Sequence, residues 1–152
     1  MDFEIREAMP GDFGAVLQLD KEAFGPDAWT IPDFLGVFSF RTVKKFTALV
    51  NGKFAGFAAS EYDWTRKAVC LMTLAVRSEY RRRGIGTALL MRCEEAFPAG
   101  KYFLNADAEN TAAIRLYERA GYRQTGVDRA YYMNGHDAVL MEKTADKQNP
   151  PL

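Results

Sequence analysis

The chain has 152 residues, a length that fits one domain with a substantial hydrophobic core. Hydrophobic residues make up 48% of it, and its 20 basic and 20 acidic side chains leave no net charge. This balance argues against a nucleic-acid-binding protein, which usually has a clear basic excess. No apolar stretch approaches the roughly 18 residues that span a bilayer, and the N-terminus lacks the pattern of a signal peptide.

The cysteines and the histidine narrow the chemistry further. Cys70 falls in an apolar stretch and Cys93 on the apolar face of an expected helix. Both are therefore expected to be reduced core residues, which favours a cytoplasmic location. His136 is the only histidine of the sequence, so a metal site built from several histidines is excluded and we expect no metal.

The N-terminal half is expected to begin with a strand and two helices and to continue with a hairpin. Apolar and polar residues alternate in the first strand, and apolar residues recur at helical spacing after Asp12, a suitable N-cap. Asn51-Gly52 between two apolar runs is a strong hairpin signal. The expected elements are a strand over residues 3–8, helices over 13–24 and about 32–40, and strands over 46–50 and 54–62.

The C-terminal half continues with alternating strands and helices. The expected elements are strands over residues 69–76 and 102–106, helices over 85–97 and 111–120, and a hairpin of 122–132 with 138–142 around Asn134-Gly135. The complete order, β-α-α-β-β-β-α-β-α-β-β, predicts an α/β fold with a central mixed sheet flanked by helices. We expect a single domain over residues 1–145 and a flexible tail over residues 146–152.

The segment between the strand over residues 69–76 and the following helix predicts an anion site. Amides at the start of a helix have no intrahelical partner and lie at the positive end of its dipole, where phosphate binds. Glycines there allow a ligand to approach the backbone. The segment lacks the lysine of a Walker loop and the third glycine of a dinucleotide fingerprint. The alternative is an ordinary basic turn. The residues of this expected site are Arg81, Arg82, Arg83, Gly84, Ile85, Gly86 and Thr87.

Two motifs carry a resemblance to a known family. Arg81, Gly84 and Gly86 form Arg-x-x-Gly-x-Gly, which resembles the acetyl-CoA pyrophosphate loop of the GNAT superfamily of N-acetyltransferases. Asn110 and Tyr117 are two helical turns apart and share a face. Taken alone they would be an N-cap and a core aromatic, but together they resemble the second GNAT signature. The resemblance extends over nearly the whole chain and implies the GNAT fold.

The resemblance also implies a reaction, the direct transfer of an acetyl group from acetyl-CoA to an amine. Main-chain amides of a splayed strand would then meet the pantetheine and the acetyl carbonyl, here those of Leu74, Ala75 and Val76. Asn110 would contact the pantetheine arm or the bound peptide. Tyr117 would protonate the departing thiolate as general acid, since a thiol has a pKa of about 8.5 and a tyrosine one of about 10.

Within the superfamily the chain most resembles the ribosomal-protein alanine N-acetyltransferases, in residues 24–30, 116–122, 129–132 and 137–141. That subgroup carries a glutamate, its proposed base, twelve positions before the tyrosine. This chain has Asn105 there, which cannot take a proton. Asp107 and Glu61 are the alternatives, each acting through water, and each could instead be a solvated surface carboxylate.

A weak base favours an acceptor amine of low pKa. An α-amine, with a pKa of about 7.7–8.0, is roughly one-tenth neutral at pH 7, whereas a lysine at about 10.4 is almost entirely charged. We therefore expect a peptide or protein N-terminus as acceptor. The alternatives are a small-molecule amine or a catalytically idle acyl-CoA-binding module, and the protein could be a monomer or a homodimer. The residues expected to contact the acceptor are Trp29, Asn105, Tyr131 and Tyr132.

Overall fold

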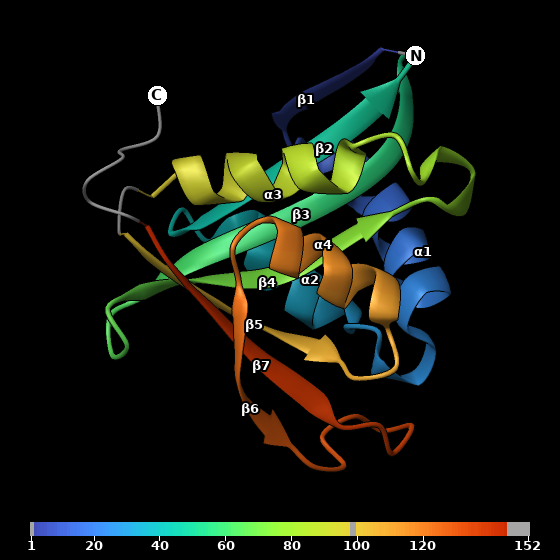
Figure 1. The fold of residues 1–152 in the computed structure, drawn as a ribbon. Coiled ribbons are helices and arrows are strands. Elements are labelled where there is room, and N and C mark those ends of the chain that lie inside the picture. The colour runs from blue at the N-terminus through green and yellow to red at the C-terminus, as the bar shows by residue number, and fades with distance from the viewer. Residues whose placement is uncertain (1, 98–99, 146–152) are drawn as a thin grey trace.

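The computed structural model describes residues 2–97 and 100–145, which form one seven-stranded sheet with helices on both faces (Figure 1). The strand order is β1-β2-β3-β4-β5-β7-β6. The strands are β1 (Phe3–Glu7), β2 (Val43–Val50), β3 (Lys53–Asp63), β4 (Ala68–Val76), β5 (Lys101–Asp107), β6 (Arg123–Asp128) and β7 (Ala138–Thr144). The α-helices are α1 (Phe13–Phe24), α2 (Ile31–Ser39), α3 (Ile85–Glu95) and α4 (Thr111–Arg119).

Local sequence explains where several of these elements begin and turn. Asn51 and Gly52 both have positive φ, 51° and 76°, and make the predicted tight turn between β2 and β3. Helix α2 begins with a capping box, because Thr30 Oγ1 accepts the Asp33 N–H and Asp33 Oδ2 accepts the Thr30 N–H at 2.8 Å. The predicted α/β fold and its order of elements are confirmed.

The sheet separates two apolar layers (Figure 1). Helices α1 and α2 cover one face, where Val16, Leu19 and Phe34 pack against Phe57 of β3. Helices α3 and α4 cover the other face, where the buried side of α3 packs on the sheet. Within the described ranges no helix is long and apolar enough to cross a membrane, and no group of three or more His, Cys, Asp or Glu could hold a metal ion.

The one parallel pair of strands, β4 and β5, is held together at only one end. The pairing covers Val69 with Tyr102 and Cys70 with Phe103, and from Leu71 onward the two strands diverge. Every other neighbouring pair is antiparallel and paired over most of its length. The divergence leaves one edge of β4 without a neighbouring strand, and this gap positions the candidate site.

Several predicted boundaries are wrong, among them the start of β2, which lies at Val43 and not at residue 46. Strand β6 ends at Asp128 and not at Tyr132, because the chain then folds back on itself: Tyr132 N–H donates to the His136 carbonyl and Gly135 N–H to the Tyr132 carbonyl, at 3.1 and 2.9 Å. Helix α3 ends at Glu95 and not at Phe97. Residues 98–99 and the predicted tail over residues 146–152 lie outside the described residues.

Candidate active site

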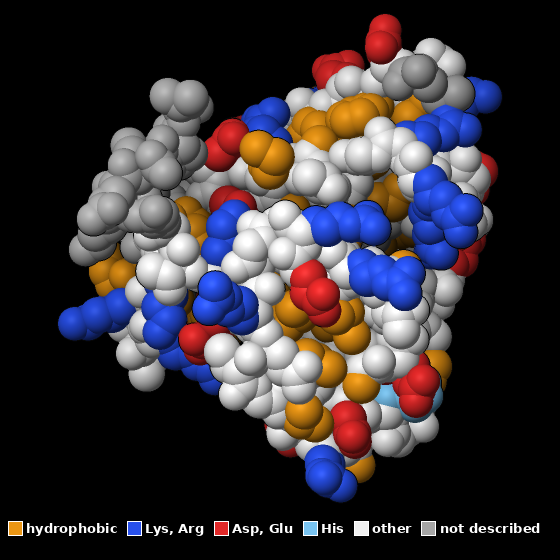
Figure 2. Space-filling model, in the orientation of Figure 1, with side chains coloured by type: hydrophobic (Ala, Val, Ile, Leu, Met, Phe, Trp, Pro, Cys, Tyr) orange, Lys and Arg blue, Asp and Glu red, His pale blue; other side chains and the backbone are white. Residues whose placement is uncertain are grey.

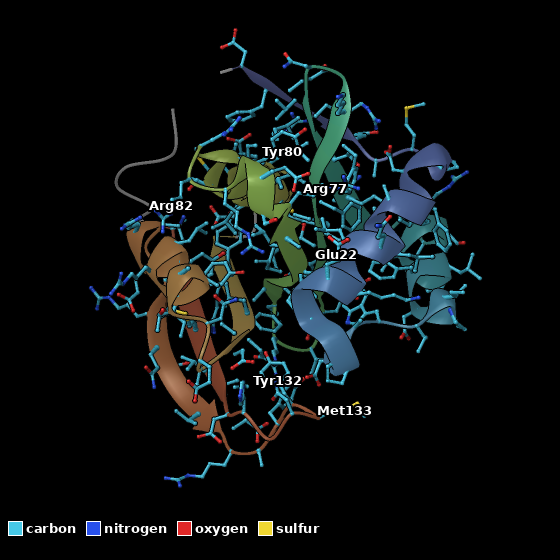
Figure 3. All side chains as sticks on the ribbon, turned by 90° about the vertical axis from the view of Figure 1, so that its right-hand side faces the viewer. Glu22, Arg77, Tyr80, Arg82, Tyr132 and Met133 are labelled. Carbon is cyan, nitrogen blue, oxygen red and sulfur yellow. The ribbon has the colours of Figure 1, made fainter. Side chains whose placement is uncertain are left out.

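The gap between β4 and β5 widens into a cavity of about 470 Å³. Figure 3 views this side of the molecule, with Arg77 and Arg82 toward one end and Tyr132 toward the other. The lining side chains come from α1, the α1–α2 loop, both diverging strands, α4 and the β6–β7 loop. They include Asp20, Asp27, Trp29, Leu71, Met72, Thr73, Leu74, Asn105, Asp107, Glu109, Asn110, Tyr117 and Tyr132. Residues far apart in sequence therefore meet around one space.

Tyr117 lines this cavity from α4 while its ring packs in the core. The residue is 7% exposed, and its ring meets that of Tyr122 edge-on with the centroids 5.9 Å apart. Burial raises the pKa of Tyr117 above the usual value of 10, so the hydroxyl is protonated at neutral pH. The packing role and the predicted place beside the reacting atoms are compatible, because the same side chain satisfies both.

Asn110 likewise combines two roles that the sequence presented as alternatives. Its Oδ1 accepts the Ala113 N–H at 3.1 Å, so the residue is the N-cap of α4. The same side chain also lines the cavity. Capping fixes its orientation and therefore places its amide reproducibly at the cavity wall.

The loop before α3 has the backbone of an anion site. Gly84 and Arg82 have positive φ, 83° and 65°, a conformation that glycine adopts without strain. The first helical hydrogen bond of α3 runs from Ala88 N–H to the Gly84 carbonyl, so the amides of Ile85, Gly86 and Thr87 have no intrahelical acceptor. Figure 2 shows Lys and Arg side chains gathered over this loop.

Gly86 serves a different purpose from the one expected. A Cβ built there would lie 2.8 Å from Leu116 Cδ1 and within 4 Å of Leu74 and Val76. A side chain at this position would therefore point into the packing between α3, α4 and β4. The expectation that Gly86 leaves room for a ligand is wrong in this respect, because the missing side chain makes room for Leu116. The backbone amide of Gly86 still belongs to the first turn of α3.

Of the three β4 residues expected to bind the cosubstrate, Leu74 lines the cavity. Ala75 and Val76 pair with Phe57 and Gly56 of β3 on one side and face the gap with the other edge. Arg81 Nε donates to the Val76 carbonyl at 3.2 Å, which links the basic loop to the end of β4. The basic loop therefore lies next to the end of β4, although none of residues 81–87 lines the cavity.

The residues expected to contact the acceptor fall into two groups. Trp29, Asn105 and Tyr132 line the cavity. Burial first, and then the Asp107 carboxylate, raises the pKa of Tyr132 to about 12. Tyr131 is 52% exposed and is absent from the cavity wall; its ring packs edge-on against Tyr132 with the centroids 5.0 Å apart. Tyr131 therefore supports the position of Tyr132.

The two carboxylates expected as alternative bases are in different places. Asp107 lines the main cavity, whereas Glu61 lines a second cavity of about 330 Å³ beside α2, which shares Trp29 and Met72 with the first. Asp107 Oδ2 is 2.9 Å from Nδ1 of His136, and Asp107 Oδ1 accepts the Glu109 N–H at 2.9 Å. The structure thus brings Asp107, and not Glu61, together with Tyr117.

The Asp107–His136 pair ties the β6–β7 loop to the end of β5 and should make that attachment depend on pH. The hydrogen bond to Asp107 raises the pKa of His136 above 6.5. Partial burial alone would raise the pKa of Asp107, but the hydrogen bonds from Glu109 and His136 bring it below 3.8. The stabilisation is therefore complete between about pH 4 and 6.5, and it is lost as pH rises through the pKa of His136 or falls through that of Asp107.

We predict that His136→Gln lowers the melting temperature at pH 6 and that this difference shrinks as the pH rises through the raised pKa of His136, above which wild-type His136 is itself neutral. Thermal denaturation of both proteins across this range tests the prediction. A difference that grows with pH would contradict it.

Sequence reasoning missed Asp20. This carboxylate is 4% exposed, lines the cavity and accepts the Trp29 N–H at 2.6 Å through Oδ2. A signal was present: Asp20 follows Val16 by four residues, so it occupies the apolar stripe of α1. A charged residue in such a stripe needs a partner or a function, because burying a carboxylate is costly.

Comparison with known proteins agrees with this architecture. The chain matches the acetyltransferase (GNAT) family over residues 13–122. It is 32% identical to an uncharacterised N-acetyltransferase of Methanocaldococcus jannaschii, covering 97% of this chain and 96% of that protein. It is 29% identical to an N-alpha-acetyltransferase of Sulfurisphaera tokodaii, covering 92% of each. The crystal structure of the ribosomal-protein-S18-alanine N-acetyltransferase from Escherichia coli superposes with a TM-score of 0.82 at 26% identity over 99% of each chain.

The fold and the family match thus define an acetyl-transferring enzyme. The chain belongs to the GNAT family of acetyltransferases. It is an N-acetyltransferase that uses acetyl-CoA as cosubstrate. The residues present fit that cosubstrate, because the first turn of α3 offers unpaired amides and β4 offers an unpaired strand edge.

Proposed function

We propose that this enzyme acetylates the free α-amine of a peptide or protein N-terminus. The observation that carries the proposal is that the two cavities are adjacent. The main cavity, which Tyr117 lines, shares the wall residues Trp29 and Met72 with the second. An acceptor whose amine lies in the main cavity could therefore continue along α2 as an extended chain. The names of relatives, which include N-alpha-acetyltransferases of three archaea, support the same acceptor class.

In this proposal, the cosubstrate binds along the part of the gap between β4 and β5 that lies nearest the start of α3. The amides of Ile85, Gly86 and Thr87, with Arg81–Arg83 around them, hold the pyrophosphate. The free edge of β4 over Leu74–Val76 binds the pantetheine and orients the acetyl carbonyl, and the capped Asn110 contacts the pantetheine arm. The loop therefore supplies positive charge for the pyrophosphate, while the strand edge aligns the acetyl group for attack.

The acceptor half of the site consists of Trp29, Asn105 and Tyr132. These side chains would hold the amine against the acetyl carbonyl. The amine nitrogen attacks the carbonyl carbon, the carbon–sulfur bond breaks, and the Tyr117 hydroxyl donates a proton to the sulfur as it leaves. Direct transfer needs no covalent enzyme intermediate. The cytoplasmic location and the state as monomer or homodimer stay predictions.

We predict that a peptide with a free N-terminus and an internal lysine is acetylated mainly at its α-amine. The α-amine is roughly one-tenth neutral at pH 7, whereas the lysine amine is neutral well below one part in a thousand. Tandem mass spectrometry of the product locates the acetyl group. The control is the same peptide with a blocked N-terminus, which should receive almost no acetyl group. Dominant modification of the lysine, or transfer only to small amines such as a polyamine, would overturn the proposed acceptor.

A further inference from the structure

Asp20 is a buried carboxylate without a cationic partner. It lies on the side of α1 that faces the sheet, beside Leu19 and one turn beyond Val16, and is 4% exposed. No lysine, arginine or histidine forms a salt bridge with it anywhere in residues 2–97 and 100–145. An uncompensated buried carboxylate costs several kcal/mol, so this position needs an explanation.

The contacts of Asp20 leave one of its oxygens available. Oδ2 accepts the Trp29 N–H at 2.6 Å, while Oδ1 accepts no hydrogen bond from the described part of the chain. Oδ1 is also not among the buried side-chain atoms that lack a partner, so it is not sealed in the core. Because Asp20 lines the main cavity, the open oxygen is accessible from that cavity.

The charge of the cavity wall points to a cationic occupant. Four carboxylates line the cavity, those of Asp20, Asp27, Asp107 and Glu109, and its described lining includes no lysine, arginine or histidine. Asp107 is paired with His136, and Asp27 accepts the Met133 N–H at 2.7 Å. Of these carboxylates, Asp20 is the one that is almost completely removed from solvent.

We propose that Asp20 binds the ammonium group of the acceptor and takes its proton before transfer. This inference rests on the proposed function, since it assigns the base for the same reaction. One proton passes from the ammonium nitrogen to Oδ1, which leaves a neutral amine. The amine attacks the acetyl carbon, and its second proton replaces the one that Tyr117 gives to the departing sulfur. Asp20 then releases its proton to water, so each turnover yields an amide, a thiol and one proton.

The surroundings of Asp20 suit a proton acceptor. Burial raises its pKa above 3.8, and the Trp29 hydrogen bond offsets only part of this. A higher pKa brings the carboxyl closer to an α-amine and makes the transfer less unfavourable. The other titratable groups that line the cavity are Asp27, Asp107, Glu109, Tyr117 and Tyr132. Both tyrosines have raised pKa values, so they are neutral in the range in which an α-amine titrates.

A purely structural role for Asp20 makes a different prediction. If the carboxylate only anchors the Trp29 loop, then Asp20→Asn should be nearly neutral, because the asparagine Oδ1 can accept the same N–H. If Asp20 takes the proton, the same change removes both the charge and the base while the anchor is kept. The asparagine variant therefore separates the two roles without disturbing the loop.

The experiment measures kcat/KM for a peptide acceptor between pH 5.5 and 9.5 in wild type and Asp20→Asn. We expect the variant to be at least about 10²-fold slower at pH 7, the lower limit of typical acid–base contributions. The ratio of wild-type to variant kcat/KM should fall roughly sevenfold between pH 7 and pH 9. An α-amine of pKa near 7.8 is largely neutral at pH 9, so it no longer needs a base to remove its proton. The melting-temperature shift with acetyl-CoA should stay unchanged, which shows that the fold and the cosubstrate site are intact.

Asp63→Asn is the matched control. Asp63 Oδ1 likewise accepts a backbone N–H, that of Thr65 at 2.9 Å, and the residue is absent from the walls of both cavities. This control should keep wild-type kcat/KM and pH profile. An Asp20→Asn enzyme with wild-type kcat/KM and pH profile would overturn the role of Asp20 alone. A wild type that acetylates only other amines would overturn the proposed function, and the same pair of variants then tests Asp20 with those amines.

Discussion

Tyr117→Phe is expected to lower kcat by roughly 10²–10⁴-fold, the usual contribution of a general acid. The substitution keeps the ring that packs against Tyr122 and removes only the hydroxyl. An interaction made only in the transition state lowers kcat and leaves binding nearly unchanged. The affinity for acetyl-CoA should therefore change little. Steady-state rates and a binding titration on the purified variant measure both quantities.

The raised pKa of Tyr117 refines how this proton moves. The sequence suggested that a phenol and a thiol of ordinary pKa could exchange a proton without a large shift. Burial raises the pKa of the phenol, so full transfer to a thiolate is less favourable than that comparison implies. In the proposed reaction a relay would avoid this cost, because the hydroxyl would give its proton to the sulfur while it receives one from the nitrogen of the tetrahedral intermediate. The hydroxyl then stays protonated throughout the working pH range.

Tyr122→Phe is the matched control for this prediction. Tyr122 is the neighbouring ring, but its hydroxyl donates to Glu94 at 2.8 Å and the residue is absent from the cavity wall. Its loss should destabilise the fold by about 1–3 kcal/mol, as expected for a hydrogen bond to a charged group, without a large change in kcat. A Tyr117→Phe variant with kcat within about twofold of wild type would show that this tyrosine only packs and that another group protonates the sulfur.

Local signals were sufficient to predict the elements and their order. The alternation of Phe3–Glu7, the Asn51-Gly52 turn and the Asn110 cap each act through contacts within a few residues. The end of β6 could not be predicted in this way. It depends on Asp137, whose Oδ1 accepts the Ala130 N–H at 2.9 Å from seven residues away. Hydrogen bonds between loop residues of this kind leave no periodic pattern in the sequence.

In the candidate site, too, some residues could be predicted from the sequence and others depended on the fold. Family motifs marked Gly84, Asn110 and Tyr117, and the structure puts the latter two in one cavity. The placement of Glu61 beside α2, away from Tyr117, depends on the sheet register and could not be deduced from spacing. Asp20 could have been recognised as a charge within an apolar stripe. Its role as a partner for the Trp29 loop required the fold.

Gly86→Glu is expected to destabilise the whole domain as well as weaken acetyl-CoA binding. A Cβ at this position lies 2.8 Å from Leu116 Cδ1, with Leu74 and Val76 behind it, so the glutamate would enter an apolar contact between helices. Overpacking and an unpaired buried carboxylate together should cost about 3–5 kcal/mol. For a domain of this size that corresponds to a fall in melting temperature of roughly 10 °C. Thermal denaturation with and without acetyl-CoA measures both effects.

Gly14→Glu is a closely matched control, because Gly14 is the second residue of α1 just as Gly86 is the second residue of α3. No atom lies within 4 Å of a Cβ at Gly14, and a carboxylate in the first turn is favourable to the helix dipole. Gly14→Glu should therefore keep the wild-type melting temperature. Gly86→Ala, which requires only a shift of Leu116, should retain acetyl-CoA binding. A Gly86→Glu protein that melts like wild type but no longer binds acetyl-CoA would show that the side chain at residue 86 points toward the phosphates and that Leu116 does not explain the glycine.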